Sequence, residues 1–171
     1  MPARRILELG DPMLRWKSET VRRAGDAALV VRDLRATLHQ FQRTHGFGRG
    51  ISAIQIGVPL RLVYIEFEGA AHALVNPEFE WMSDEKFVLW DDCFSFPNLM
   101  VKLERSIAVR LRYHDANGER LTLAASGALS ELLQHEMDHQ DGVLALDRAL
   151  DENSLATRAE WERRFEGVKF P

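Results

Sequence analysis

Cysteine is almost missing from this chain of 171 residues, because Cys93 is the single example. An internal disulfide is therefore impossible, and in a reducing compartment a lone thiol serves as a core residue, a metal ligand or a nucleophile. The chain also lacks any run of about 18 apolar residues, which a membrane-spanning helix needs. Its N-terminus, Met1-Pro2-Ala3-Arg4-Arg5, leads into no apolar signal segment. We expect a cytoplasmic protein with no membrane partner.

An excess of basic charge is missing as well. The chain has 22 Lys and Arg residues against 26 Asp and Glu residues, and its net charge is −4. This balance excludes the basic surface typical of nucleic-acid-binding proteins and polybasic membrane anchors. With 46% hydrophobic residues, the chain is long enough for one domain with a substantial core and too short for two. We therefore expect a single domain over residues 1–171.

The strongest chemical signal is the run His135-Glu136-Met137-Asp138-His139. Residues four apart share one face of a helix, so both imidazoles can bind one metal ion while Glu136 points at its open side. Such an ion makes a bound water acidic, and the glutamate takes its proton during attack on a carbonyl. Apolar neighbours predict a buried helix from Ala128 to Gln140. The alternative is a surface helix with two unrelated histidines and a solvated acid.

β structure is predicted from Arg61 to Tyr113, where short runs of branched and aromatic residues alternate with turn signals such as Asn76-Pro77. A hairpin turn at Asp115–Glu119 is expected to lead into a return strand, Leu121–Leu123.

Two further helices are predicted from apolar residues at helical spacing. The first runs from Asp26 to His45, with Asp26 as its N-cap and Gly46 as its stop. The second, over 154–165, carries many charges and is expected to be a solvated terminal helix.

Glycine is concentrated in the segment Gly46–Gly57, which lacks the strand-then-helix context of a dinucleotide-binding loop. Glycines in a strand let another backbone approach, so a substrate peptide can lie along this segment; the alternative is a mobile loop. Gln55 is a polar side chain among apolar neighbours. A buried amide needs partners, and one place where it finds them is beside a reacting carbonyl.

Two histidines leave the metal without a third protein ligand, and three patterns offer one. A Met-turn protease would continue the motif to another histidine, but Ala145 occupies that position. A thermolysin-like protease would use a downstream glutamate, and the spacing of Glu160 allows this. The third option is Cys93.

Three ordered motifs together resemble the peptide deformylase family. Gly48 to Gln55, Asp91 to Ser95 and Gln134 to His139 match the family motifs Gly-φ-Gly-φ-Ala-Ala-x-Gln, Glu-Gly-Cys-Leu-Ser and Gln-His-Glu-x-Asp-His. The resemblance covers most of the chain. It implies an α+β fold in which antiparallel strands surround one central metal-binding helix. It also implies removal of the formyl group from the N-terminal methionine of new bacterial chains, an N-formylated substrate that the enzyme meets at the ribosome.

The resemblance implies a metal centre. Cys93, His135 and His139 would bind one divalent ion, with Glu136 as the general base. The family's physiological metal is Fe(II), and Zn or Ni are the alternatives in purified protein.

The resemblance also assigns residues around the substrate. The Gln55 side chain and the Phe94 backbone N–H would stabilise the oxyanion. Gly48, Gly50 and Glu131 would bind substrate, with Gly50 in the strand that pairs with the peptide. Outside the site, Arg105 is similar to a family arginine that braces the helix through a salt bridge, here to Asp138.

Several positions depart from the family pattern; they are Arg49, Ser52, Asp91, Asp92, Phe94 and Glu131. Glu131 lies one turn before His135, near the methionine pocket, at a position where family members carry an apolar residue or arginine. An acid there is predicted to accept methionine poorly unless it turns outward or pairs with a cation. Arg49 is a candidate partner, since its guanidinium can reach across to Glu131.

The leading hypothesis is therefore a metal-dependent hydrolase of the deformylase type. The alternatives are a paralogue that acts on another N-formyl or N-acyl amine, a metalloprotease with Glu160 as ligand, and a catalytically silent metal-binding or ribosome-associated module. Cys93 distinguishes the first two from the protease, and Glu136 argues against the silent module because only turnover requires it.

Overall fold

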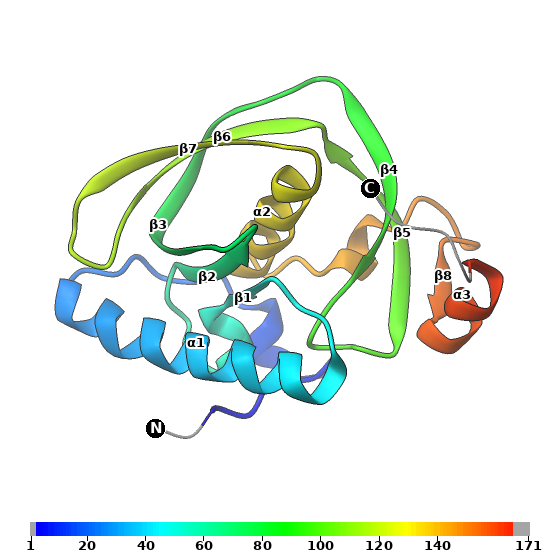
Figure 1. The fold of residues 1–171 in the computed structure, drawn as a ribbon, viewed down its shortest axis with the longest axis horizontal. Coiled ribbons are helices and arrows are strands. Elements are labelled where there is room, and N and C mark those ends of the chain that lie inside the picture. Colours follow the sequence, from blue (N-terminus) through cyan, green and yellow to red (C-terminus); the bar gives the residue numbers. More distant parts are fainter. Residues whose placement is uncertain (1–2, 166–171) are drawn as a thin grey trace.

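The structure is a computed structural model that describes residues 3–165. Two antiparallel sheets surround helix α2 (Gly127–Gln140), which lies in the middle of the molecule (Figure 1). Within the described residues, one sheet has the strand order β1-β2-β3-β6-β7 and the other β4-β5-β8. The strands are β1 Gly50–Ser52, β2 Leu62–Phe67, β3 Ala70–Met82, β4 Lys86–Asp92, β5 Leu99–Ser106, β6 Ala108–His114, β7 Arg120–Ser126 and β8 Leu155–Thr157. This is the α+β fold that the sequence predicts.

The remaining helices lie at the periphery. α1 (Ala24–His45) packs its apolar face against β1 and β2, and α3 (Arg158–Phe165) lies beside β8 (Figure 1). Three short 3-10 helices are η1 Pro12–Arg15, η2 Ala53–Ile56 and η3 Ala145–Arg148. Among residues 3–165 no helix has the length and apolar character to cross a membrane.

The predicted N-cap of α1 was wrong. The helix begins two residues earlier, Arg23 is the N-cap residue and no side chain caps the helix. Asp26 instead lies in the first turn, where its negative charge still faces the positive end of the helix dipole. Gly46 ends the helix as predicted, with a left-handed φ of 80° that suits glycine.

The Asn76-Pro77 turn predicted from sequence lies inside strand β3. Asn76 has a left-handed φ of 50°, and the register between β3 and β6 shifts between Val75 and Glu78. This is a bulge, which accommodates a proline that cannot donate to the ladder. The Asn76 side chain accepts from the Val21 N–H at 2.8 Å and donates to the Val21 carbonyl at 2.9 Å. A contact from a distant segment therefore holds a conformation that would otherwise end the strand.

The C-terminal helix is shorter than predicted. Residues 155–157 form β8, which pairs with β5, and α3 begins only at Arg158. The Arg158 N–H donates to the Asn98 carbonyl at 2.7 Å, so pairing with the sheet displaces the first helical turn. α3 contains no buried residue, in agreement with the predicted solvated helix.

Helix α2 is buried on most sides. Ten of its fourteen residues are buried, which excludes the surface helix considered as an alternative. Leu132 and Leu133 pack into a cluster with Val63 and Leu111 of the five-stranded sheet. The Gln134 side-chain amide accepts a hydrogen bond from the Ser106 N–H at 3.0 Å and donates one to the Ser106 carbonyl at 2.9 Å. These two bonds fix the helix to β5.

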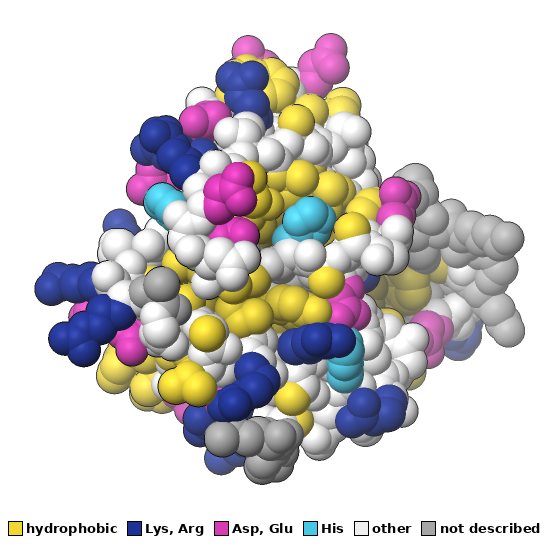
Figure 2. All heavy atoms as spheres, turned by 60° about the vertical axis from the view of Figure 1, so that its left-hand side comes forward, with side chains coloured by type: hydrophobic (Ala, Val, Ile, Leu, Met, Phe, Trp, Pro, Cys, Tyr) yellow, Lys and Arg dark blue, Asp and Glu magenta, His cyan; other side chains and the backbone are white. Residues whose placement is uncertain are grey.

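The surface carries charges of both signs. On the face seen in Figure 2, acidic and basic side chains are interspersed around exposed apolar side chains. This distribution agrees with the near balance of charge in the sequence.

Candidate metal centre

Cys93, His135 and His139 converge on one point inside the molecule. All three are buried, and their potential ligand atoms lie within 4.8 Å of one another. The Cys93 Sγ is 3.3 Å from His139 Nε2, which is 3.2 Å from His135 Nε2. Cys93 directly follows β4, whereas the histidines lie one turn apart on α2. The fold therefore joins two of the sequence motifs at a single cluster.

The residues in this cluster fit a divalent metal ion. One sulfur and two imidazole nitrogens form the donor set that zinc and iron sites use, with a fourth position open for water or substrate. Burial lowers the pKa of His139 well below its ordinary value, so its imidazole is neutral and keeps a lone pair. The Nδ1 of His135 is hydrogen-bonded elsewhere, which leaves its Nε2 directed at the cluster.

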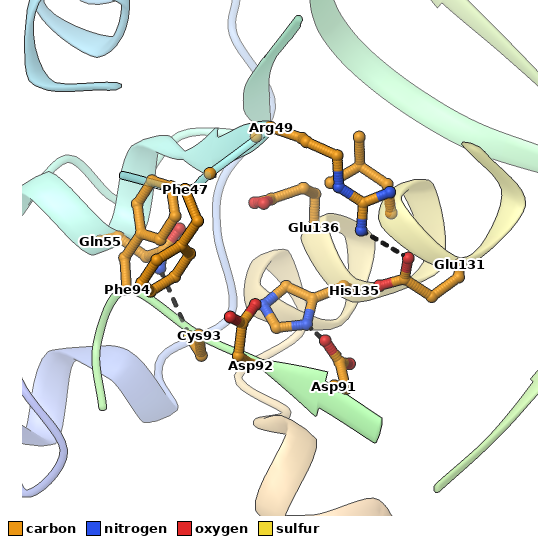
Figure 3. Close-up of a pocket in the computed structure, with 13 residues that line it drawn as sticks. Phe47, Arg49, Gln55, Asp91, Asp92, Cys93, Phe94, Glu131, His135 and Glu136 are labelled. Atoms are coloured by element: carbon orange, nitrogen blue, oxygen red, sulfur yellow. Dashed lines mark hydrogen bonds and ion pairs between the residues drawn. The ribbon is translucent and has the colours of Figure 1, made fainter. Parts of the chain in front are cut away.

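Asp91 is a functional residue whose role the sequence did not reveal. Its Oδ2 accepts a hydrogen bond from His135 Nδ1 at 2.9 Å (Figure 3). The same oxygen accepts from Arg105 Nη2 at 3.1 Å. Burial alone would raise the pKa of Asp91, but His135 and Arg105 outweigh it and lower the pKa. A signal was available, because residues two apart in a strand share a face and Asp91 precedes Cys93 by two.

The expected salt bridge between Arg105 and Asp138 is present. Arg105 Nη1 lies 2.5 Å from Asp138 Oδ2, and both side chains are largely buried. Asp138 also accepts from Nε and Nη2 of Arg148, at 2.6 and 2.5 Å. Arg105 therefore connects Asp91, beside the cluster, to the last turn of α2.

Glu136 faces the cavity beside the cluster. Its Oε2 accepts from the Ser52 Oγ at 2.9 Å, and a Cβ added to Gly50 would lie 2.8 Å from its Oε1. A side chain at Gly50 would therefore crowd the Glu136 carboxylate, and it would also meet Leu132 and Ile65 at 3.0 and 3.1 Å. Burial raises the pKa of Glu136 to about 7, a value suited to taking up and releasing a proton near neutral pH.

Gln55 and Phe94 lie on the opposite side of the cavity from α2 (Figure 3). The Gln55 Oε1 accepts from the Ser52 N–H at 2.9 Å, which turns its Nε2 toward Cys93 Sγ, 3.6 Å away. Within residues 3–165, the Phe94 N–H donates to no acceptor and so stays available. The Phe94 ring stacks on Phe41, and any Cβ at Gly48 would clash with it.

These groups line one cavity of about 450 Å³. Residues 47–50 form one wall, residues 91–94 form the other, and α2 forms the back with Glu131, Leu132, His135 and Glu136. The structure therefore places the residues predicted for the base, the oxyanion and the substrate in one cavity, which Cys93 and His135 of the metal cluster also line.

Glu131 does face the cavity, but it is not alone. Arg49 Nη2 lies 2.7 Å from Glu131 Oε2 (Figure 3). Arg49 Nη1 donates to the Ala128 carbonyl at 3.2 Å. Burial and the nearby Asp91 raise the pKa of Glu131, whereas Arg49 opposes this shift. Of the two situations considered from sequence, a lone acid or an acid paired with Arg49, the structure contains the pair.

Glu160 is not a third ligand. It lies on the exposed helix α3, where its carboxylate accepts from Nε and Nη2 of Arg163 at 2.9 and 2.6 Å. The third potential ligand beside the two histidines is Cys93. The metalloprotease alternative, which required Glu160 as a ligand, is therefore not supported.

Comparison with known proteins agrees with this geometry. The family model for polypeptide deformylase matches residues 3–154. The peptide deformylase of Bartonella tribocorum is 37% identical over 156 residues, with 86% of this chain and 84% of the relative covered. That of Dictyoglomus turgidum is 33% identical, with 88% and 95% covered.

Solved structures show the same fold. The peptide deformylase of Thermotoga maritima superimposes with a TM-score of 0.83 at 28% identity, covering 88% of this chain and all of the other. The enzyme from Synechococcus elongatus, solved in complex with actinonin, also gives 0.83, at 30% identity with 90% and 82% covered. The resemblance seen in three motifs thus extends over nearly the whole chain, which belongs to the polypeptide deformylase family.

Proposed function

We propose that this protein is a metal-dependent peptide deformylase that removes the formyl group from formyl-methionine at the N-terminus of new chains. The observation that carries the proposal is the buried set Cys93, His135 and His139, with Glu136 and Gln55 beside it in one cavity. Relatives that are more than 30% identical bear the name peptide deformylase, which supports the same reaction.

The substrate peptide is proposed to lie as an extended strand between the two sheets. β1 and β4 are the outermost strands of their sheets in the described part of the chain, and both border the cavity. Outer strands offer unpaired N–H and C=O groups to an added strand. Gly48 and Gly50 line the β1 side of the cavity, where the peptide backbone would pair, and the formyl group would reach the metal cluster.

Each catalytic group has a separate role. A bound divalent ion would act as a Lewis acid on the formyl carbonyl and make water acidic. Glu136 accepts the proton of the water that attacks the formyl carbon, and later delivers it to the leaving amine nitrogen. The Gln55 Nε2–H and the Phe94 N–H donate to the oxygen on which negative charge develops. Water and the formyl amide thus become formate and a free amine.

We propose Fe(II) as the metal in the cell, because the resemblance to peptide deformylases implies it. Affinity alone does not select it, because nitrogen and sulfur donors bind zinc and nickel more tightly than ferrous iron. Purified protein is therefore expected to hold Zn or Ni unless iron is supplied. A single domain over residues 1–171, a cytoplasmic location and action at the ribosome stay predictions.

The test measures formate release from a formyl-Met tripeptide by the iron-loaded protein and by Glu136→Gln. The amide keeps the shape of the carboxylate but accepts no proton, so we expect the rate to fall by roughly 10² to 10⁴ with metal content unchanged.

Glu160→Gln is the matched control, since it changes an exposed glutamate in the same way. It should keep both metal and activity. If Glu136→Gln kept activity within a few-fold of wild type, Glu136 could not be the general base. If Glu160→Gln lost metal, the metalloprotease alternative would again be supported.

A further inference from the structure

The Arg49–Glu131 ion pair is a feature of the cavity that the reaction itself does not require. Only 8% of the Glu131 side chain is exposed, whereas 42% of the Arg49 side chain is. Both residues line the cavity together with the apolar Leu132. Figure 3 shows one Glu131 oxygen directed at Arg49, while the carboxylate lies on the same side of the cavity as His135. Glu131 is thus an acid at the back of the cavity, and its partner Arg49 comes from the wall formed by residues 47–50.

The pair lines the same cavity as the cluster residues Cys93 and His135, close enough to meet the first side chain of a bound substrate. Glu131 is four residues before the cluster residue His135, which places it about one helical turn, roughly 6 Å, along α2. The substrate Cα is two bonds from the formyl carbon, or roughly 2.4 Å, and the side chain branches there. With the formyl group at the cluster, the first side chain therefore falls within reach of Arg49 and Glu131.

The two charges are not independent. A carboxylate removed from water is costly unless it is paired, and removing one partner of a buried pair leaves the other charge uncompensated. The Arg49 guanidinium donates one hydrogen bond to Glu131 and one to the Ala128 carbonyl, and these two bonds hold it against α2. Its more exposed guanidinium can turn to water if Glu131 is removed, whereas the buried Glu131 has no comparable escape.

We propose that Arg49 and Glu131 form one specificity-determining unit, in which the guanidinium neutralises the carboxylate so that the site accepts the uncharged methionine side chain. This inference rests on the proposed deformylase function. If either residue of the pair is removed, the remaining charge should favour a charged first side chain over methionine. Unpaired Glu131 selects a cationic first side chain, and unpaired Arg49 selects an anionic one.

The experiment measures kcat/KM of the iron-loaded protein for formyl-Met, formyl-Lys and formyl-Glu tripeptides. Arg49→Met should raise the formyl-Lys to formyl-Met ratio by about tenfold or more, because Glu131 loses its partner. Glu131→Leu should raise the formyl-Glu to formyl-Met ratio by a smaller factor, about threefold, because Arg49 can turn to solvent. The double variant should return both ratios to within about twofold of wild type.

Ratios between substrates on one variant are insensitive to partial unfolding or partial metal loading, since both lower every rate equally. Arg163→Met with Glu160→Leu removes an exposed ion pair of the same type on α3, and should change neither ratio. The inference is overturned if Arg49→Met leaves the formyl-Lys ratio at the wild-type value, or if the double variant merely combines the two single effects. Absence of formate release from all three substrates by wild type would instead reject the proposed function.

Discussion

At the residue scale, Asp91 connects the metal cluster to the protein core. One carboxylate oxygen accepts from both His135 and Arg105, so a single side chain orients a ligand and is itself held in place. A carboxylate bonded to Nδ1 fixes the tautomer of the imidazole and increases the basicity of its Nε2.

We expect Asp91→Asn to weaken metal binding by about 10- to 100-fold, because the amide removes the negative charge from this hydrogen bond. Competition with a chelator of known affinity measures the change. Asp92→Asn is the control: its carboxylate pairs with Arg158 and makes no hydrogen bond to His135 or His139, so the substitution should leave the affinity nearly unaltered. Equal losses in both variants would mean that general charge, and not the bond to His135, is responsible.

At the element scale, α2 is held in position by charges as well as by apolar packing. The Arg105 side chain is 2% exposed and faces the carboxylates of Asp91 and Asp138 on separate elements. Arg148 contacts the same Asp138 from the surface, with 45% of its side chain exposed.

Arg105→Leu is expected to destabilise the protein by about 3 to 5 kcal/mol, because it removes a buried cation that contacts both the fully buried Asp91 and the largely buried Asp138. Arg148→Leu should cost about 1 kcal/mol or less, since exposed ion pairs are weak. Urea unfolding of both variants gives the comparison. Similar losses would show that burial of Arg105 has no energetic consequence.

At the scale of the whole molecule, the three proposed ligands join separate layers. Cys93 follows β4 of the three-stranded sheet, whereas both histidines lie on α2, which packs its leucines on the five-stranded sheet. A bound ion would therefore link the two sheets. It would also stabilise the folded chain, because the three ligands come together only in the folded state.

Removal of the metal should accordingly lower the melting temperature. At a free metal concentration about 100 times Kd, binding contributes about 2.7 kcal/mol. For a chain of this size that corresponds to roughly 5 to 10 °C. Calorimetry with and without chelator tests this, and Cys93→Ala should show a much smaller response. If the alanine variant kept full metal and the same shift, Cys93 would be a core residue and not a ligand.

Several features of the site and the fold could be predicted from local sequence patterns. The helical period places His135 and His139 on one face and Glu136 next to them, and three ordered motifs carried the assignment to the deformylase family. Helix α1 and the hairpin at Asp115 also follow from spacing and turn residues. These features depend on interactions within a few residues, which a sequence pattern records directly.

Contacts between distant segments had to come from the tertiary structure. Asn76 continues a strand because Val21 bonds its side chain, and residues 155–157 become β8 because β5 lies beside them. Sequence identified Glu131 as an anomaly and Arg49 as a candidate partner, but their 2.7 Å pairing depends on how a loop and a helix 82 residues apart pack. Such pairings are decided by packing and by the need to neutralise buried charge, and no local period in the chain encodes them.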